Sequence, residues 1–272
     1  MRRAVLLLAT MALAMLLASG MARAIINGEP DIGEDAHPYV GALVTEFEVE
    51  PGETELVPVC SGTLISPTVF LTAGHCTEEL VGDETLPTYV TFDPTYEPGE
   101  SRLISGTPYI HPMYEFPLYD VGVVVLDEPV RTGAGYAKLP RTNRVDTLEK
   151  GTYLTAVGYG ATDWDVGGGP PQPVYPDDRY AATVRYLGTT WDLGYYPRET
   201  RDMWLKVRAG SMGEGGEGQC YGDSGGPYFL PNQRTIAGVT SFGISPFCTG
   251  VAGVQRVDQR VVLKWIRGFL DS

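Results

Sequence analysis

Positive charge is scarce in this sequence. Its 272 residues include 20 Lys and Arg against 34 Asp and Glu, which gives a formal net charge of −14 at pH 7. Residues 1–24 contain three of the Arg and none of the acids, so the rest of the chain carries −17. Such a chain repels phosphate backbones, which argues against nucleic-acid binding. We interpret the acidity as favouring solubility; a preference for basic substrates is the weaker alternative.

Long hydrophobic runs are lacking beyond the N-terminus. The one such run, Ala4–Ala18, is broken only by Thr10, follows Arg2 and Arg3, and precedes an A-x-A sequence at Ala22–Ala24. This order predicts a signal peptide over residues 1–24. A membrane anchor is the weaker alternative, because the run is shorter than the roughly 20 residues that a span needs. The mature chain is therefore expected to be secreted and extracellular, without stable membrane association.

Cysteine and histidine are also few. There are four Cys, at positions 60, 76, 220 and 248, and three His, at positions 37, 75 and 111. No two Cys have the C-x-x-C spacing of zinc sites, which argues against a metal. An even number of Cys in an exported chain predicts two disulfides, and the residues alone leave three pairings open. We expect His37 at the surface and no catalytic role for His111.

Amphipathic helical patterns are absent until the C-terminus. Short β-prone runs separated by turn residues recur instead, among them Tyr39–Thr45, Thr68–Gly74, Val121–Leu126 and Thr235–Gly243. The 34 Gly and 21 Pro fit a chain with many turns. This pattern predicts an all-β protein of sandwich or barrel type. The segment from Val261 to Phe269 has apolar residues at helical spacing, which predicts a C-terminal α-helix.

One octapeptide, "CYGDSGGP" at Cys220–Pro227, has the composition of a nucleophile turn. Ser224 has glycine close on both sides, and glycine allows unusual backbone angles and close approach of a substrate. Consecutive backbone N–H groups around such a turn can bind a developing oxyanion. The pattern alone is weak, so it needs a base and an orienting acid elsewhere in the chain.

Both partners are present. "LTAGHC" places His75 after a β-prone run and directly before Cys76, which can anchor it. "YDVGVVVL" places Asp120 at the start of a buried strand, where a carboxylate is costly unless it is hydrogen-bonded. An imidazole N–H would satisfy that carboxylate. We therefore predict that Ser224 attacks a carbonyl, that His75 accepts the serine proton, and that Asp120 orients the imidazole.

These motifs, together with "IINGEP" at Ile25–Pro30 and "TSFG" at Thr240–Gly243, resemble those of the chymotrypsin/trypsin family of serine proteases and occur in that family's order. The resemblance implies an all-β fold of two six-stranded antiparallel β-barrels, with the active site in the cleft between them and a C-terminal helix. Residues 25–134 would form the N-terminal barrel, and residues 135–272 the C-terminal barrel and helix. Together they would make one peptidase domain.

The resemblance also implies particular contacts within the site. The oxyanion hole would consist of the backbone N–H groups of Gly222 and Ser224. The hydroxyl of Ser241 would donate a hydrogen bond to the carboxylate of Asp120. Two disulfides are implied, Cys60–Cys76 and Cys220–Cys248. On the chain-entropy model, each closure stabilises the fold by roughly 3 kcal/mol.

Activation through the N-terminus is a further implication. In this family the amine of the mature N-terminus, here Ile25, forms a buried ion pair with the acid before the nucleophile, here Asp223. Most zymogens of the family carry Arg or Lys directly before that residue, whereas here Ala24 precedes it and ends the A-x-A sequence. We predict that signal peptidase makes the activating cut. Cleavage after Gly20 followed by trimming is the alternative.

Substrate selectivity is expected to depend on six residues: Gly218, Gln219, Ser241, Phe242, Gly243 and Gly253. Gly218, six residues before the nucleophile, stands at the family's pocket base, where trypsin-like members carry Asp. The missing acid favours large apolar or aromatic P1 residues. A shifted alignment that brings Glu214 or Glu217 into the pocket would restore a preference for Lys and Arg. Phe242 replaces a usual Trp, and Gln255 a usual aromatic residue.

The predicted function is a secreted, monomeric serine endopeptidase that acts on polypeptides, is open to protein protease inhibitors and uses no cofactor. The competing class is a catalytically inactive relative that binds other proteins, although such relatives usually lack a triad residue. An α/β-hydrolase esterase is excluded, because its triad follows the order Ser, Asp, His. The acidic loop Thr77–Glu100 corresponds to a calcium-binding loop in some family members. We interpret it as a solvated loop, because the sequence shows no clear spacing of calcium ligands.

Overall fold

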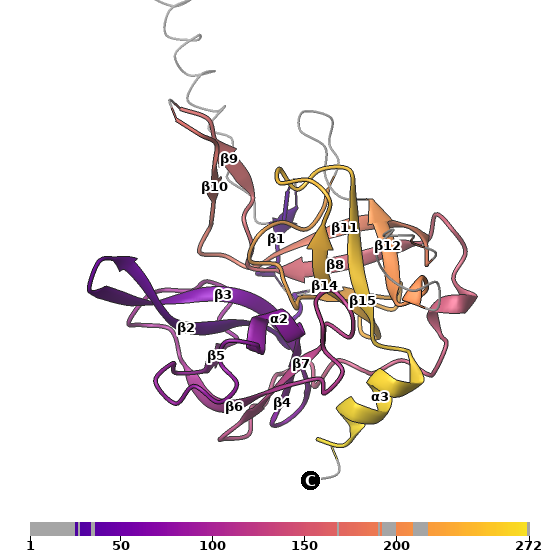
Figure 1. Ribbon diagram of the computed structural model, residues 1–272, viewed down its shortest axis with the longest axis horizontal. Helices are drawn as coiled ribbons and strands as arrows, with labels where there is room; N and C mark the ends of the chain where they lie inside the picture. The colour runs from indigo at the N-terminus through magenta and orange to yellow at the C-terminus, as the bar shows by residue number, and fades with distance from the viewer. Residues whose placement is uncertain are drawn as a thin grey trace, which may run out of the picture.

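The computed structural model describes residues 25–26, 28–33, 36–167, 169–189, 191, 200–208 and 217–270. The expected signal peptide, residues 1–24, and Glu214 lie outside this set. Two β-barrels lie side by side, the first in the purple part of the chain and the second in its pink to yellow part (Figure 1). The expected all-β fold with a terminal helix is confirmed. Among the described residues, no helix is long and apolar enough to cross a membrane.

The first barrel closes through six antiparallel strands in the order β2-β3-β4-β7-β6-β5. Its core is apolar, and Phe70, Leu71 and Val124 have no exposed surface. β4 is buried along its whole length because it lies between β3 and β7. The strands are β2 (Val40–Glu50), β3 (Glu53–Ser66), β4 (Val69–Thr72), β5 (Tyr89–Thr91), β6 (Ile104–Ile110) and β7 (Gly122–Leu126).

The second barrel closes because β8 pairs with both β13 and β11. β11 shows the alternation of a strand with one face in the core. Its residues Ala182 and Val184 are buried, whereas Thr183 and Arg185 are exposed. The strands are β8 (Tyr153–Gly158), β11 (Tyr180–Gly188), β12 (Trp204–Arg208), β13 (Pro227–Phe229), β14 (Ile236–Gly243) and β15 (Val251–Arg256).

The start of the described chain joins the second barrel. β1 (Glu29–Pro30) pairs with β11, and Ile26 forms a bridge with Gly218. The Ile25 side chain is 1% exposed and belongs to the apolar cluster inside the second barrel. Sequence order had assigned this segment to the first barrel, within residues 25–134. Strand pairing and the burial of Ile25 place it on the second barrel instead.

The C-terminal helix reaches back to the first barrel. α3 (Arg260–Arg267) buries Val262 and Ile266, and the ring of Phe269 just beyond it contacts Tyr109 of β6. The start of the described chain therefore packs on the second barrel, and its end packs on the first barrel (Figure 1). The remaining elements are α2 (Gly74–Thr77), the 3-10 helix η1 (Val145–Thr147), and the hairpin strands β9 (Asp163–Asp165) and β10 (Gln172–Val174).

A buried polar cluster corrects the expectation for His37, which is 7% exposed rather than at the surface. Its Nδ1 lies 2.9 Å from Asp31 Oδ1, and its ring stacks on Phe229. Asp31 Oδ2 accepts a hydrogen bond from Arg179 Nε at 2.7 Å. Burial acts to raise the pKa of Asp31, but the His37 hydrogen bond and the Arg179 charge outweigh it and lower this pKa. Paired in this way, all three polar side chains tolerate burial.

Candidate active site

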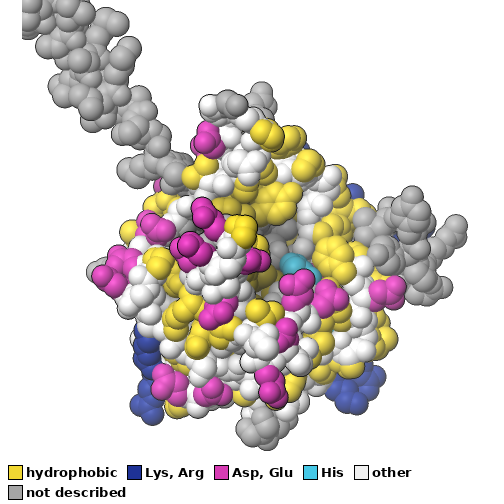
Figure 2. All heavy atoms as spheres, turned by 60° about the vertical axis from the view of Figure 1, so that its left-hand side comes forward, with side chains coloured by type: hydrophobic (Ala, Val, Ile, Leu, Met, Phe, Trp, Pro, Cys, Tyr) yellow, Lys and Arg dark blue, Asp and Glu magenta, His cyan; other side chains and the backbone are white. Residues whose placement is uncertain are grey.

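A cavity of about 540 Å³ lies where the two barrels meet. The first barrel and its loops contribute His75, Glu78 and Phe116 to its lining, and the second contributes Ser224 and Phe242. Residues far apart in the sequence therefore reach one cavity. Acidic side chains lie among hydrophobic ones on the face drawn in Figure 2, in keeping with the negative net charge of the chain.

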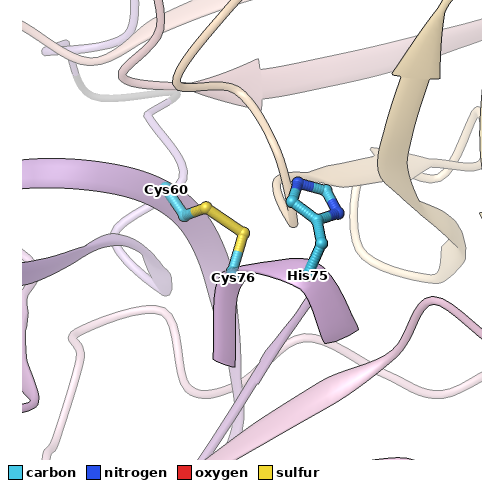
Figure 3. A group of neighbouring side chains, drawn as sticks. All are labelled: Cys60, His75 and Cys76. Carbon is cyan, nitrogen blue, oxygen red and sulfur yellow. A yellow bond between two sulfur atoms is a disulfide. The ribbon is translucent and has the colours of Figure 1, made fainter. Parts of the chain in front are cut away.

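His75 is fixed by hydrogen bonds to Asp120 and by the disulfide of the next residue, Cys76. It lies in α2, directly before Cys76, whose disulfide to Cys60 ties α2 to β3 (S–S 1.99 Å; Figure 3). The His75 backbone N–H donates to Asp120 Oδ1 at 2.8 Å, and its Nδ1 lies 2.8 Å from Asp120 Oδ2. Both ends of the carboxylate therefore contact one histidine. One ring nitrogen of His75 lies within 4.8 Å of both sulfurs of this disulfide, and the side chain is 24% exposed.

Asp120 is completely buried just before β7. Besides the two contacts with His75, its Oδ2 accepts a hydrogen bond of 2.6 Å from the hydroxyl of Ser241. Three hydrogen bonds to an ionised carboxylate compensate for its removal from water. Because the carboxylate accepts from Nδ1–H, it selects the imidazole tautomer whose Nε2 has a free lone pair. That nitrogen is the one available to a proton donor in the cavity.

Gln255 supports Asp120 from behind. Its Oε1 accepts a hydrogen bond from the Asp120 backbone N–H at 3.2 Å. Its Nε2 donates to the carbonyl oxygens of Met203 at 3.3 Å and Arg256 at 3.0 Å. The side chain is fully buried, so all of its hydrogen-bonding atoms are engaged within the protein. The sequence marked Gln255 only as a departure from an aromatic residue and did not indicate this contact.

The nucleophile turn depends on glycine. Gly222 and Gly225, on either side of Ser224, have φ of 90° and 79°, in the left-handed region that favours glycine. A Cβ at Gly225 would lie 2.0 Å from Thr72 Oγ1 of the first barrel. The turn therefore packs directly against β4, and no larger residue fits there.

Ser61 connects this turn to the first barrel. The Ser61 backbone N–H donates to the Ser224 carbonyl oxygen at 2.8 Å. Its hydroxyl donates to the Gly222 carbonyl oxygen at 2.9 Å and accepts from the Tyr159 N–H at the same distance. Ser61 is completely buried in β3. It thus restrains the turn that carries Gly222 and Ser224, the two residues predicted to form the oxyanion hole, a role that no local sequence signal indicated.

Asp223 is 1% exposed, and no cationic side chain among the described residues is paired with its carboxylate. Its Oδ1 accepts from the Gly160 N–H at 2.9 Å, and its Oδ2 from the Cys220 N–H at 2.8 Å. Burial raises the pKa of Asp223 to about 7, although the two backbone hydrogen bonds act in the opposite direction. A Cβ at Gly158 would lie 2.3 Å from this carboxylate, so the surrounding backbone encloses it closely.

Four of the six expected selectivity residues line the cavity: Gln219, Ser241, Phe242 and Gly243. Gly218 and Gly253 are not among its lining residues. Gly218 pairs with Ile26 in a bridge instead. Gly253 lies beneath the Phe242 ring, where a Cβ would come within 2.4 Å of ring carbons. Glycine has no side chain to line a cavity, so the placement of Gly218 at the pocket base stays a prediction.

The acids considered for the pocket lie elsewhere or outside the described chain. Glu217 Oε2 accepts a hydrogen bond from the Thr183 N–H at 2.8 Å, on β11. Glu78 is the acidic side chain that does line the cavity, and the hydroxyl of Tyr114 donates to its carboxylate at 2.8 Å. The inner walls are formed instead by Ala252, Ser245, Thr249 and the Cys220–Cys248 disulfide, whose S–S distance is 2.05 Å.

An aromatic cluster supports Phe242. Its ring centroid lies 5.1 Å from that of Trp191 and 5.8 Å from that of Trp204. Trp204 Nε1 donates to the Pro117 carbonyl oxygen at 3.0 Å, in the loop that leads to Asp120. The ring of Phe116 in the same loop meets His75 edge-on at 5.5 Å. The cluster thereby joins a cavity wall of the second barrel to the triad loop of the first.

Cys60, His75 and Cys76 are close enough to suggest a metal centre, with ligand atoms within 4.8 Å of one another. The two sulfurs, however, are bonded to each other and cannot supply thiolates (Figure 3). The donor set therefore does not fit a metal ion. The disulfide acts on His75 by fixing the backbone beside it.

Known proteins share this arrangement. The Trypsin family model matches residues 26–266. A trypsin of Saccharopolyspora erythraea is 29% identical over 243 residues, covering 85% of this chain and 91% of its own. Human kallikrein-4 is 27% identical over 246 residues, covering 88% and 84%. "Inactive snake venom serine proteinase 13" of Crotalus adamanteus is 26% identical over 193 residues, covering 70% and 69%.

Solved structures agree on the fold. HL collagenase superposes with a TM-score of 0.68 at 21% identity, covering 91% of this chain and 99% of its own. Human heparin binding protein gives a TM-score of 0.63 at 19% identity, covering 91% and 97%. At such identities the likeness shows the double-barrel fold alone. The chemistry has to be argued from the residues of the cavity.

Proposed function

The chain belongs to the trypsin family of serine endopeptidases, and on this premise we propose that it cleaves polypeptides through an acyl-enzyme formed on Ser224. The observation that carries the proposal is the His75–Asp120–Ser241 hydrogen-bond chain at the cavity that Ser224 lines. A buried acid, an oriented imidazole and a hydroxyl nucleophile are the groups that acyl transfer requires.

The proposed reaction has two stages, formation of the acyl-enzyme and its hydrolysis. The oxygen of Ser224 bonds to the substrate carbonyl carbon while its proton passes to His75 Nε2. Asp120 stabilises the imidazolium that results, and the N–H groups of Gly222 and Ser224 bind the oxyanion. The C–N bond then breaks as His75 returns the proton to the leaving amine. Water repeats these steps on the ester and releases the acid.

Paired variants test this assignment. We expect Ser224→Ala to lower kcat/KM for a peptide substrate by at least about 10⁴-fold, since it removes the nucleophile. Tyr153→Ala is the control, because this exposed residue on β8 lies outside the cavity. Equal activity of Ser224→Ala and the unmodified enzyme would refute the proposal.

For the residue before the scissile bond, we propose a preference for large apolar or aromatic side chains. Phe242, Ala252 and the disulfide provide apolar walls, while Ser245 and Thr249 provide only neutral hydroxyls. A preference for Lys or Arg is the alternative, which would require Glu214 or an induced movement of Glu217. Matched p-nitroanilides ending in Phe and Arg decide between them, and faster cleavage of the Arg substrate would overturn the apolar assignment.

For maturation, we propose that removal of residues 1–24 secretes the protein and activates it in the same cut. The Ile25 side chain already lies in the core of the second barrel, and among the described residues no cationic side chain is paired with the buried Asp223 carboxylate. A free amine at Ile25 would supply that cation. N-terminal sequencing of secreted, active enzyme should begin at Ile25; any other N-terminus in active enzyme contradicts the proposal.

An inactive, protein-binding relative is the second candidate, because one similar protein carries "inactive" in its name. Against it stand the hydrogen bonds that join His75 and Ser241 to Asp120, and the presence of Ser224 in the lining of the same cavity. Polypeptide substrates and protein inhibitors would both enter the same cavity. Tight binding of a polypeptide, without any turnover of p-nitroanilides and without labelling of Ser224 by a fluorophosphonate, would favour the inactive candidate.

A further inference from the structure

Positive and negative charges are unevenly distributed along this chain. Residues 25–101 contain 16 Asp and Glu and no Lys or Arg, whereas residues 102–272 contain 18 acidic and 17 basic residues. On the face drawn in Figure 2, acidic side chains are spread widely and basic ones lie at the margins. Most of the first barrel therefore repels an acidic partner, and a surface that attracts one has to come from the later part of the chain.

A cavity of about 410 Å³ lies where the connection between the two barrels meets the turn between β13 and β14. Of the nine described residues that line it, Lys138, Arg141 and Arg144 are cationic and none is acidic. The salt bridges among the described residues do not include these three side chains. Positive charge without an internal partner in a concave surface attracts anionic groups, and the arginine fork of N–H donors matches a carboxylate.

The backbone beneath these cations is fixed. The Lys138 N–H donates to the Arg234 carbonyl oxygen at 2.9 Å, which joins the two sides of the cavity. The Arg144 N–H donates to the Arg141 carbonyl oxygen at 3.1 Å and closes a turn. The Arg144 guanidinium also donates to the hydroxyl of Thr147, and its other N–H groups remain for a ligand. Cations held on a fixed backbone lose less entropy when they bind.

Apolar residues form much of the remaining lining. Pro140 and Leu230 are buried, Leu139 is half-buried and Pro231 is exposed. A sulfated or phosphorylated polymer has few apolar groups to place against these walls. A peptide segment can instead present a large apolar side chain next to Asp or Glu. The combination of cations and apolar walls therefore favours an acidic peptide that also carries apolar residues.

This cavity is separate from the active site. It shares none of its described lining residues with the cavity that Ser224 lines. β13 leads from the nucleophile turn to Leu230, six residues beyond Ser224, and six residues of chain span at most about 22 Å. A peptide bound at Leu230 would leave the first cavity open to a substrate.

We propose that this cavity, the basic cavity, binds an acidic segment of a partner protein in which a large apolar side chain lies next to Asp or Glu. The carboxylates pair with Lys138, Arg141 and Arg144, and the apolar side chain packs against Leu139 and Pro231. Repulsion by the acidic first barrel directs such a partner to the basic cavity. The inference does not depend on acyl transfer at Ser224.

Fluorescence anisotropy with labelled nonapeptides tests the proposal on the mature chain carrying Ser224→Ala, a variant meant to leave the probes uncut. A peptide of alternating Glu and Leu should bind at least about tenfold more tightly than one of alternating Glu and Ser, since only the first buries apolar area. A peptide of alternating Lys and Leu should bind at least about tenfold more weakly than the Glu/Leu peptide. Raising the salt concentration from about 0.05 M to about 0.5 M should weaken Glu/Leu binding at least about fivefold.

Charge reversal locates the binding site. Lys138→Glu together with Arg141→Glu should weaken binding of the Glu/Leu peptide at least about tenfold. Lys150→Glu together with Arg185→Glu is the matched control, because both side chains are exposed and lie outside the basic cavity while the net charge changes equally. Urea unfolding should show that both double variants are folded. With Ser224 restored, both should keep the p-nitroanilide turnover of the unmodified enzyme, because the basic cavity lies outside the active site.

Four results would overturn the inference. Equal affinity of the two double variants for the Glu/Leu peptide would place binding elsewhere. Equal binding of the Glu/Ser and Glu/Leu peptides would show attraction of any anionic chain, and tighter binding of dextran sulfate would assign the cavity to a polysaccharide. A dimer that only the Lys138→Glu and Arg141→Glu pair dissociates, without peptide binding, would assign it to a second copy of the chain. Turnover of p-nitroanilides tests the protease assignment separately from all four.

Discussion

One additional residue at the mature N-terminus should destabilise the protein in a pH-dependent manner. Asp223 is 1% exposed, and its burial raises its pKa to about 7. An unfolded Asp has a pKa of about 3.9. A chain that begins at Ile25 can place its ammonium group against this carboxylate. A chain that begins at Ala24 has an amide at that nitrogen and cannot.

The sign follows from proton binding. Between about pH 4 and pH 7, the folded Ala24 chain keeps the Asp223 proton whereas the unfolded chain has lost it. The stability of this chain therefore falls as the pH rises through that window, and it stays lowered above it. A difference of about three pKa units corresponds to roughly 4 kcal/mol. In the Ile25 chain, the ammonium group offsets this loss until the amine itself is deprotonated at higher pH.

Urea unfolding of the two chains, both carrying Ser224→Ala to prevent autolysis, measures the difference. Near pH 4 we expect similar free energies of unfolding, and near pH 8 a deficit on the order of 4 kcal/mol for the Ala24 chain. Asp223→Asn in the Ala24 chain should remove most of its pH dependence. Parallel pH profiles for the Ile25 and Ala24 chains would refute the reasoning.

Three further substitutions test the supports of the site. Gln255→Leu removes the acceptor of the Asp120 N–H, so kcat should fall about tenfold with KM nearly unchanged; an unchanged kcat would show that the contact has no positioning role. Ser61→Ala leaves the Gly222 carbonyl and the Tyr159 N–H unpaired. Urea unfolding should show a free energy of unfolding lower by about 1–3 kcal/mol, and steady-state kinetics should show a lower kcat. Gly225→Ala places a Cβ 2.0 Å from Thr72 Oγ1, so expression should yield no stable active enzyme; a stable, active variant would contradict the tight packing.

The sequence could predict the parts of the fold that depend on patterns among neighbouring residues. Alternating β-prone runs predicted the strands, and apolar spacing after Val261 predicted α3, because each pattern reflects burial of one face. The short motifs around His75, Asp120 and Ser224 were recognisable because their geometry depends on adjacent residues. The closure of two barrels followed from the resemblance rather than from the runs themselves.

Long-range contacts are what the sequence did not reveal. Gln255 and Ser61 look like ordinary polar residues within strand patterns, and their partners lie 135 and 161 positions away. Gly218 pairs with Ile26 across the fold, a contact that no local pattern indicated. His37 lies in the interior, where its partner Asp31 also accepts a hydrogen bond from the distant Arg179. Each outcome depends on which segments the two barrels bring together.

The most direct test of the central claim is mass spectrometry of the mature enzyme after treatment with a fluorophosphonate. If Ser224 is the activated nucleophile, one adduct per chain should map to the peptide that contains Ser224. Prior alkylation or substitution of His75 should suppress labelling, because the serine would lose its base. A folded, mature protein that remains unlabelled, or an adduct on another residue, would contradict the account.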